Sequence, residues 1–389
     1  MEAKMKGNKI ACLLILAAIM VPASAVKIED ATISPQMANS QTDFTHTVFA
    51  EFSTATWCSY CKYAHAALKD IYAHGWYPFY YVSLVYDENV HASGRLDDLN
   101  TYYLPTVYFD GGYLVEVGGD PQTTEGYYNE SIISCGARQV SDVDVSLSAM
   151  WMGNATMKID VAVYNNEVLG YEGYLKVYVT EISSARGWLD TGDHPYTFAS
   201  LDYALNGDVQ VGPKETWQET VIWNGNEHTD GHGGTFGNIT ADNIMIIAAL
   251  SNAEWHQGYA VPPREQPFDA YYVDDTAAAI PGMDTSPPQV TVEIPKEGYL
   301  CLMGKEIIPV GATVLIGAIT ARADANDAET GIGVVEFYVD DTLQSTVSSY
   351  PYEWLWDAPA FFKHTLKVVA KDFAGNTASD EREVWIFNI

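Results

Sequence analysis

The pattern of hydrophobic and polar positions divides the chain after residue 43 into three parts. In the first, residues 44–138, an apolar run at 48–52 predicts a strand, and a nearly unbroken run at 79–85 predicts a strand that is buried on both faces of a sheet. Between them, apolar residues recur at helical spacing from Cys58 to His74, which predicts a helix. This part therefore begins as a strand, a turn, a helix and a second strand.

Two further runs, 105–109 and 113–117, flank Asp110-Gly111-Gly112, and this arrangement predicts a hairpin. Another helix is expected over residues 123–137. Because strands and helices are mixed in this way, residues 44–138 are predicted to form an α/β domain.

Residues 140–283 show a different, alternating pattern. Apolar and polar residues alternate over 143–149 and again over 157–163, which predicts a hairpin with one buried face. Further strand-like runs lie at 174–179, 244–250 and 271–273. Pro262, Pro263 and Pro267 are expected in loops, and the whole part is predicted to be a β-sandwich.

Residues 286–389 follow a stiff, proline-containing linker at 284–288. Strand-length apolar runs recur there at 290–294, 314–319, 334–339, 352–356, 366–370 and 384–386. The segments 335–341, 351–354 and 370–376 resemble the bacterial and archaeal immunoglobulin-like repeats of secreted surface proteins. The resemblance implies an immunoglobulin-like sandwich with a role in spacing, adhesion or display, and association with the cell surface.

The first 25 residues have the layout of a signal peptide. Lys4, Lys6 and Lys9 precede an apolar run at 10–21, and the small residues Ala23-Ser24-Ala25 follow it. The alternative is a retained membrane anchor, but the run is shorter than the ~20 apolar residues that a spanning helix needs. Export is therefore expected, with residues 26–43 as a linker.

Charge excludes one class of partner. The chain has 20 basic and 51 acidic residues and a formal net charge of −31, which repels nucleic acid and anionic lipid. The acidic residues are scattered, and the 26 tyrosines and 10 tryptophans are typical of a folded protein. A folded protein with a hydrated acidic surface is expected, without DNA or RNA partners.

Four cysteines remain after export, namely Cys58, Cys61, Cys135 and Cys301, and they allow three pairings. Cys58 and Cys61 form a Cys-X-X-Cys pair at the start of the predicted helix. The unpaired N–H groups at a helix N-terminus stabilise a thiolate, which makes Cys58 the expected nucleophile. Cys61 lies one turn further along, where it can resolve a mixed disulfide formed at Cys58.

With Trp57 before this pair and Leu104-Pro105-Thr106 downstream, residues 44–138 resemble the thioredoxin superfamily. The resemblance implies that Pro105 is a cis-proline facing the dithiol. It also implies that Leu104 and Trp57 contact the substrate.

The same resemblance assigns the buried acid of the family to Glu51 as a proton acceptor. Glu51 is one residue further from the cysteines than the family pattern, and the dipeptide Ser59-Tyr60 replaces Gly-Pro. The redox potential therefore cannot be carried over from thioredoxin.

The sequence predicts an exported thiol-disulfide oxidoreductase that acts on protein thiols or disulfides outside the cytoplasm, with an unknown redox partner, no cofactor and no metal. The alternative is a surface adhesion or structural protein with a non-catalytic thioredoxin-like module, in which the dithiol is a structural disulfide or a relic.

Metal sites are weaker alternatives. Their candidate ligands are Cys58, Cys61 and His65; His228, Asp230 and His232; and, for calcium, Asp324, Asn326 and Asp327. Asn129, Asn154 and Asn238 begin glycosylation sequons, for which surface loops are expected.

Overall fold

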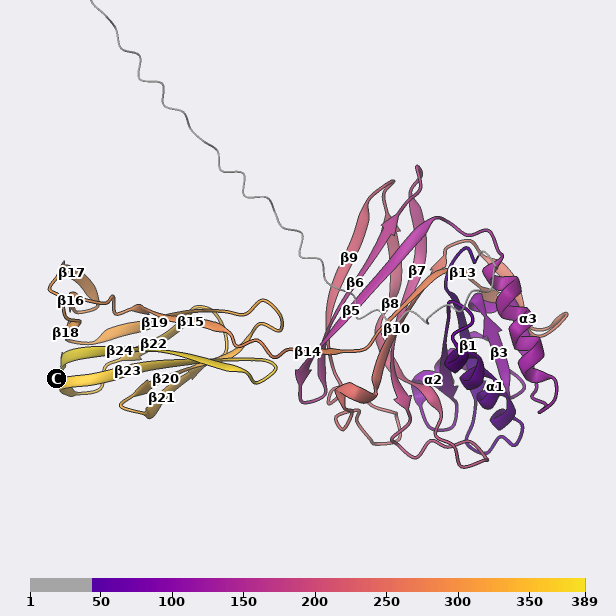
Figure 1. Ribbon diagram of the computed structural model, residues 1–389, viewed down its shortest axis with the longest axis horizontal. Helices are drawn as coiled ribbons and strands as arrows, with labels where there is room; N and C mark the ends of the chain where they lie inside the picture. Colours follow the sequence, from indigo (N-terminus) through magenta and orange to yellow (C-terminus); the bar gives the residue numbers. More distant parts are fainter. Residues whose placement is uncertain (1–43, 389) are drawn as a thin grey trace, which may run out of the picture. The chain divides into compact units, whose positions relative to one another are not determined.

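The computed structural model describes residues 44–388, and the predicted signal peptide and linker at 1–43 lie outside this range. The described chain is mostly β-structure in several sheets (Figure 1). No helix in this range has both the length and the apolar character needed to cross a membrane.

The first four strands form one half of a larger sheet. They are β1 (Val48–Thr54), β2 (Phe79–Val85), β3 (Thr106–Phe109) and β4 (Leu114–Val117), in the order β2-β1-β3-β4. β1 is parallel to β2 and antiparallel to β3. Every residue of β1 and β2 is buried, which confirms the prediction for β2 from its nearly unbroken apolar run. The short 3-10 helix Asp110–Gly112 makes the turn between β3 and β4.

Three helices accompany these strands: α1 (Cys61–His74), α2 (Val90–Asp98) and α3 (Thr124–Gly136). α1 and α3 pack against each other (Figure 1). The prediction that α1 begins at Cys58 is wrong by one turn, because Tyr60 is its N-cap and Cys58 lies in the preceding turn. The sequence pattern gave no indication of α2, which is short and buries only Ala92 and Leu96.

The middle part consists of two facing sheets. Its strands are β5 (Val143–Gly153), β6 (Thr156–Asn165), β7 (Tyr171–Ser183), β8 (Thr197–Val211), β9 (Thr216–Asn224), β10 (Ile244–Asn252), β13 (Val273–Ala279) and β14 (Gly282–Met283). A 3-10 helix, Ala241–Asn243, precedes β10. One sheet has the order β14-β5-β6-β9, and the other contains β13-β10-β7-β8. The two sheets pack together as the predicted sandwich.

The sandwich and the first four strands share a sheet. β8 pairs in parallel with β2 at Ser83 and Ala199, which completes an eight-stranded sheet with the order β13-β10-β7-β8-β2-β1-β3-β4. The Asn89 amide strengthens the junction by donating to the carbonyls of Ser200 and Leu201 at 2.8 and 2.7 Å. One hydrophobic core runs through both regions. The loop between β7 and β8 is consequently held beside α1.

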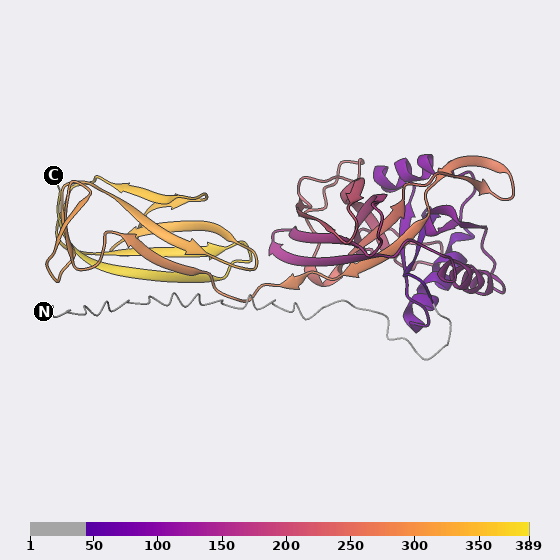
Figure 2. The same ribbon diagram turned by 90° about the horizontal axis from the view of Figure 1, so that it is seen from above.

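A hairpin of β11 (His256–Val261) and β12 (Glu265–Ala270) projects beyond the sandwich and packs near β4 (Figure 2). Phe268 anchors it against Tyr108, with ring centroids 5.4 Å apart. The prediction that Pro267 lies in a loop is wrong, because this residue is inside β12. Proline has no backbone N–H to donate to a neighbouring strand. This is tolerated at Pro267 because both strands of a two-stranded hairpin are edge strands.

Residues 289–388 form a separate β-sandwich with its own core. Its strands are β15 (Gln289–Ile294), β16 (Tyr299–Leu302), β17 (Lys305–Pro309), β18 (Val314–Ile316), β19 (Ile319–Asn326), β20 (Ile332–Val339), β21 (Thr342–Val347), β22 (Tyr352–Trp356), β23 (Ala360–Asp372) and β24 (Thr377–Asn388). They form the sheets β15-β19-β22 and β17-β16-β18-β24-β23-β20-β21. The run at 314–319 is two strands and not one, because Gly317 adopts a positive φ of 82° between them.

We expect residues 286–389 to fold as an independent unit after limited proteolysis. The buried side chains of this core, from Val292 to Ile386, all belong to the segment itself. Cleavage before residue 286 therefore leaves the core buried. Circular dichroism and thermal unfolding of the isolated fragment test this. An unfolded fragment would contradict the prediction.

Candidate functional site

Cys58 and Cys61 are joined by a disulfide at the N-terminus of α1. A tight turn precedes the helix, in which the Cys58 N–H donates to the Ala55 carbonyl at 3.1 Å and the Cys61 N–H to the Cys58 carbonyl at 3.3 Å. Cys58 is 4% exposed and Cys61 is 0% exposed. Solvent therefore reaches Cys58 slightly and Cys61 not at all, which is the order of accessibility expected of an attacking and a resolving cysteine.

Two exposed aromatic side chains are near neighbours of this disulfide in the sequence. Trp57 is 63% exposed and Tyr60 is 64% exposed, and they flank Cys58 in sequence. A groove of about 440 Å³ is lined by Trp57, Tyr86, Leu96, Asp97, Thr101, Tyr102, Tyr103 and Leu104. The structure thus brings together the two predicted substrate-contact residues, Trp57 and Leu104, in one groove of aromatic and polar side chains.

Pro105 lies close to the disulfide-bearing turn. The Leu104–Pro105 peptide bond is cis, and the Pro105 carbonyl accepts from the Gly118 N–H at 2.8 Å. A Cβ atom added to Gly119 would lie 2.6 Å from the Tyr60 carbonyl oxygen and 3.4 Å from Pro105 Cγ. Gly119 is therefore the narrow spacer between the turn of Tyr60 and Pro105, and a larger residue would push them apart.

Glu51 lies on the other face of the sheet from α1. Its carboxylate accepts two hydrogen bonds from Arg95 of α2, at 2.7 and 2.8 Å, and one from the Tyr178 hydroxyl at 2.7 Å. Side chains alternate along β1, and Phe52 on the opposite face packs against Tyr196, a neighbour of α1.

Burial alone would raise the pKa of Glu51, but the Arg95 guanidinium more than offsets this and the pKa is lowered. Glu51 is therefore a charged, paired structural residue that faces away from the dithiol. We do not assign it the proton-acceptor role that the family resemblance implied.

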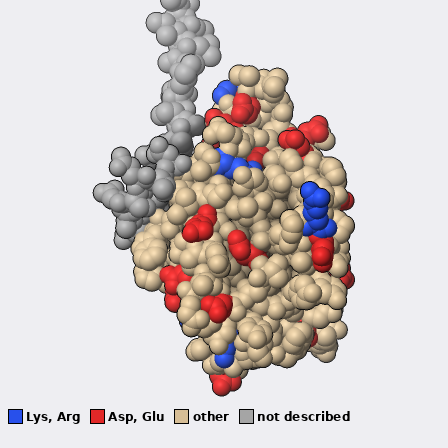
Figure 3. Space-filling model, turned by 90° about the vertical axis from the view of Figure 1, so that its right-hand side faces the viewer, with Lys and Arg blue, Asp and Glu red and all other residues tan. Residues whose placement is uncertain are grey.

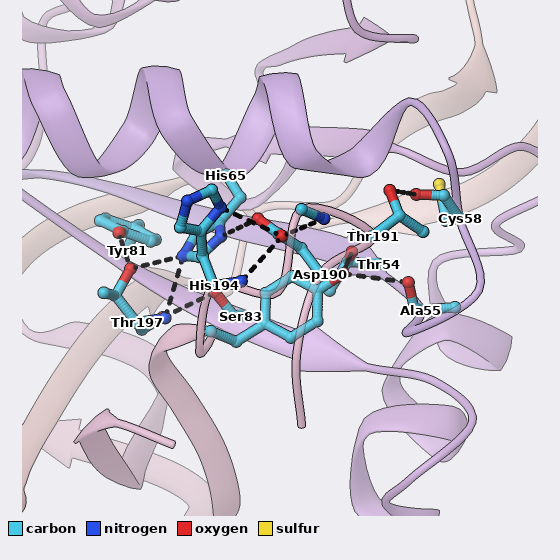
Figure 4. Close-up of polar contacts among 12 residues, drawn as sticks. Thr54, Ala55, Cys58, His65, Tyr81, Ser83, Asp190, Thr191, His194 and Thr197 are labelled. Atoms are coloured by element: carbon cyan, nitrogen blue, oxygen red, sulfur yellow. Dashed lines mark hydrogen bonds and ion pairs between the residues drawn. The ribbon is translucent and has the colours of Figure 1, made fainter. Parts of the chain in front are cut away.

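A buried histidine and aspartate occupy the α1 face instead (Figure 4). His65 is one helical turn beyond Cys61, and its Nδ1 lies 2.8 Å from an Asp190 carboxylate oxygen. Asp190 belongs to the β7–β8 loop, and its neighbour Thr191 donates a hydrogen bond from its hydroxyl to the Cys58 carbonyl at 3.4 Å. Sequence reasoning missed Asp190 and Thr191, which lie more than a hundred positions from the cysteines and belong to no recognisable motif.

The proposed metal ligands are engaged in other ways. His65 pairs with Asp190, and His228 Nδ1 lies 2.6 Å from a carboxylate oxygen of Asp202. Asp230 accepts from backbone N–H groups of its own loop.

Across residues 44–388, the acidic, histidine and cysteine groups close enough to share an ion are Asp284, Asp327 and Glu329. Asp324 is not among them, and Asp327 accepts from three backbone N–H groups within its own turn. Of the three predicted calcium ligands, only Asp327 therefore belongs to this acidic group, together with two residues that the sequence did not single out.

The three sequons differ in their surroundings. Asn154 and Asn238 are exposed outside the strands, as expected for surface loops. Asn129 lies inside α3, where its amide donates to the Glu125 carbonyl at 2.9 Å, so the expectation of a loop is wrong there.

Acidic side chains are scattered over the surface. On the face that Figure 3 shows, they are separated by uncharged residues and interspersed with a few basic ones. This agrees with the even distribution of acidic residues along the sequence.

Comparison with known proteins identifies one family. Residues 309–368 match the family described as Bacterial Ig domain, which supports the immunoglobulin-like fold of the C-terminal part. No curated protein matches the chain.

Among solved structures, HBP35 of Porphyromonas gingivalis is 10% identical, with 88% of this chain and 98% of that chain covered and a TM-score of 0.44. The fibronectin(III)-like modules of Clostridium thermocellum CbhA are 21% identical, with 26% and 98% covered and a TM-score of 0.21.

Proposed function

We propose that the chain is an exported thiol-disulfide oxidoreductase that exchanges disulfides with extracytoplasmic proteins through Cys58 and Cys61. The observation that carries the proposal is the Cys58–Cys61 disulfide at the N-terminus of α1, next to Trp57, which lines a groove of aromatic and polar side chains. A helix N-terminus stabilises the thiolate that reduction of this disulfide releases. The groove offers an unfolded or extended client a place to bind next to the sulfur atoms.

The arrangement of residues 44–138 supports a thioredoxin-like domain. β1, α1 and β2 form a parallel crossover unit, and the β3–β4 hairpin joins the other edge of β1. Pro105 immediately precedes β3 and approaches the turn of Tyr60 through Gly119. These are the positions that the resemblance to the thioredoxin superfamily assigns to the dithiol and its proline.

The exchange proceeds by two thiolate attacks. A client thiolate attacks Cys58 Sγ, the Cys58–Cys61 bond breaks, and Cys61 leaves as a thiolate that takes up a proton. A second client thiolate then attacks the client sulfur of the mixed disulfide, which releases Cys58 as a thiolate and leaves the client oxidised. The reverse sequence reduces a client disulfide.

We expect the purified protein to exchange electrons with a glutathione redox buffer at a potential above about −300 mV, the range of exchangeable disulfides. Free thiols are trapped with an alkylating reagent at each buffer ratio. Mass spectrometry of the alkylated protein then gives the fraction in which Cys58 and Cys61 are reduced. A potential below about −300 mV would indicate an inert structural bridge and remove the basis of the proposal.

The second candidate function is a surface adhesion or structural protein with a non-catalytic dithiol. The match of residues 309–368 to Bacterial Ig domain and the low exposure of Cys58, at 4%, favour it. An inert potential together with the absence of client adducts would support this function over exchange.

A further inference from the structure

We propose that Asp190, a buried carboxylate supplied by the β7–β8 loop, is a positioning residue that sets the redox equilibrium of Cys58 and Cys61. The inference rests on the proposed function, since it assigns a tuning group to the same dithiol. It also gives the sandwich a part in the chemistry, because this loop connects two of its strands.

The Asp190 carboxylate is fixed by three hydrogen bonds from two parts of the chain. One oxygen accepts from the backbone N–H groups of Gly192 and His194, at 2.7 and 3.2 Å. The other lies 2.8 Å from His65 Nδ1, and the exposed His194 ring approaches the first oxygen at 3.3 Å. Side-chain exposure of Asp190 is only 1%.

His65 is a neutral partner in this pair. Its Nε2 accepts the Thr197 backbone N–H at 3.1 Å, so Nδ1 carries the proton and donates it to Asp190. Burial lowers the pKa of His65 despite the opposing effect of Asp190. Burial alone would raise the pKa of Asp190, but the hydrogen bonds from His65 and from the backbone lower it. At neutral pH the pair therefore carries one net negative charge.

This charge lies close to the start of the redox helix. Thr191, the next residue after Asp190, contacts the Cys58 backbone through its hydroxyl, as Figure 4 shows. At an effective dielectric constant of about 20, a charge about 10 Å away shifts a pKa by about one unit. We take this separation for Asp190, because the next residue, Thr191, contacts Cys58 directly.

The other charged groups around His65 and Asp190 do not cancel the negative charge of Asp190. Lys69 of α1 is exposed, His194 is a mostly exposed imidazole, and Asp87 after β2 adds negative charge. The tyrosines that face it, Tyr81 and Tyr196, have raised pKa values because of burial and stay neutral. Asp190 thus opposes the thiolate that the N-terminus of α1 favours.

Removal of the Asp190 charge should stabilise the reduced form. We expect Asp190→Asn to lower the alkylation midpoint of Cys58 by about one pH unit and, at a pH above the midpoints of both proteins, to shift the glutathione equilibrium about tenfold toward the reduced form. Asp193→Asn is the matched control, because it removes an exposed acid of the same loop. It should change neither readout. A loss of packing alone would lower thermal stability without a directed shift of the alkylation midpoint.

A second pair of variants keeps the test decisive if Asp190→Asn does not fold. Thr191 is exposed, and Thr191→Lys places a positive charge beside Asp190, whereas Thr191→Gln removes the same hydroxyl without adding charge. The lysine variant should shift the midpoint downward relative to the glutamine variant. Unchanged midpoints in Asp190→Asn and in Thr191→Lys, each relative to its control, would overturn the inference.

The two readouts need no client protein, so this inference and the proposed function fail separately. If the wild type shows no exchange with clients but Asp190→Asn shifts the equilibrium, the tuning role stands and the oxidoreductase function falls. If the wild type exchanges with clients and neither charge variant shifts the equilibrium, the function stands and the role of Asp190 is wrong.

Discussion

A Cys61→Ser variant recovered from its host is expected to carry mixed disulfides at Cys58, whereas a Cys58→Ser variant is expected to carry none. Cys58 lies before α1 and keeps some contact with solvent, but Cys61 is the first residue of the helix and is fully buried. Once Cys58 has attacked a client disulfide, a Cys61→Ser protein lacks the thiol that releases the client. Non-reducing gels of each variant, followed by peptide identification, measure the trapped species.

The chain offers a matched control for this experiment. Cys301 is a buried free thiol of the C-terminal sandwich, and burial raises its pKa, so Cys301→Ser should leave the adducts of Cys61→Ser unchanged. Reduced wild type should also react with iodoacetamide at Cys58 first, with a midpoint below the ~8.5 of a free thiol. Equal absence of adducts in both cysteine variants, with an unshifted midpoint, would favour the adhesion or structural alternative.

Much of the fold follows from local sequence patterns. The buried runs of β1 and β2, the alternating residues of β5 and β6 and the short runs of the C-terminal sandwich all predicted strands where strands occur. These signals succeed because burial on one or both faces imposes a period that the sequence must follow. The failures have equally local causes. α2 buries only two side chains, which is too few to produce a helical pattern in the sequence. The start of α1 depends on the turn before it, and the spacing of apolar residues does not distinguish this turn from the helix.

Contacts between distant segments were beyond the reach of sequence patterns. Local periodicity gives no information about the pairing of β8 with β2. This pairing is what places the β7–β8 loop beside α1, so the position of the loop could not be predicted either. The family resemblance places the acid of the dithiol within the first domain, at Glu51, but the acid on the α1 face is Asp190. A motif points to Trp57, Leu104 and Pro105, and the first two line the groove while Pro105 lies close to the turn of Tyr60.

The largest loss of stability is expected from Arg95→Met. Arg95 forms a two-point ion pair with Glu51, whose side chain is 2% exposed, and the substitution leaves that carboxylate buried without its cation. Removal of one partner from a buried pair costs about 3–5 kcal/mol, because the remaining charge keeps its desolvation penalty. Urea unfolding at neutral pH, followed by fluorescence, measures the change in the free energy of unfolding.

The dependence of this loss on pH identifies its cause. In the wild type the pKa of Glu51 is lowered, so the pair stabilises the fold above the ordinary glutamate pKa, and this contribution disappears as the pH falls through the lowered value. In Arg95→Met, burial should raise the pKa of Glu51, and its protonation in mild acid then removes the unpaired charge. The difference in stability between wild type and variant should therefore shrink from pH 7 to pH 4. The double variant Glu51→Gln/Arg95→Met should regain part of the loss at pH 7, since the amide oxygen still accepts from Tyr178 and the buried side chain at position 51 is no longer charged. A loss below about 1 kcal/mol, the level of an exposed ion pair, or one that is equal at both pH values, would show that Arg95 does not hold a buried charge in place.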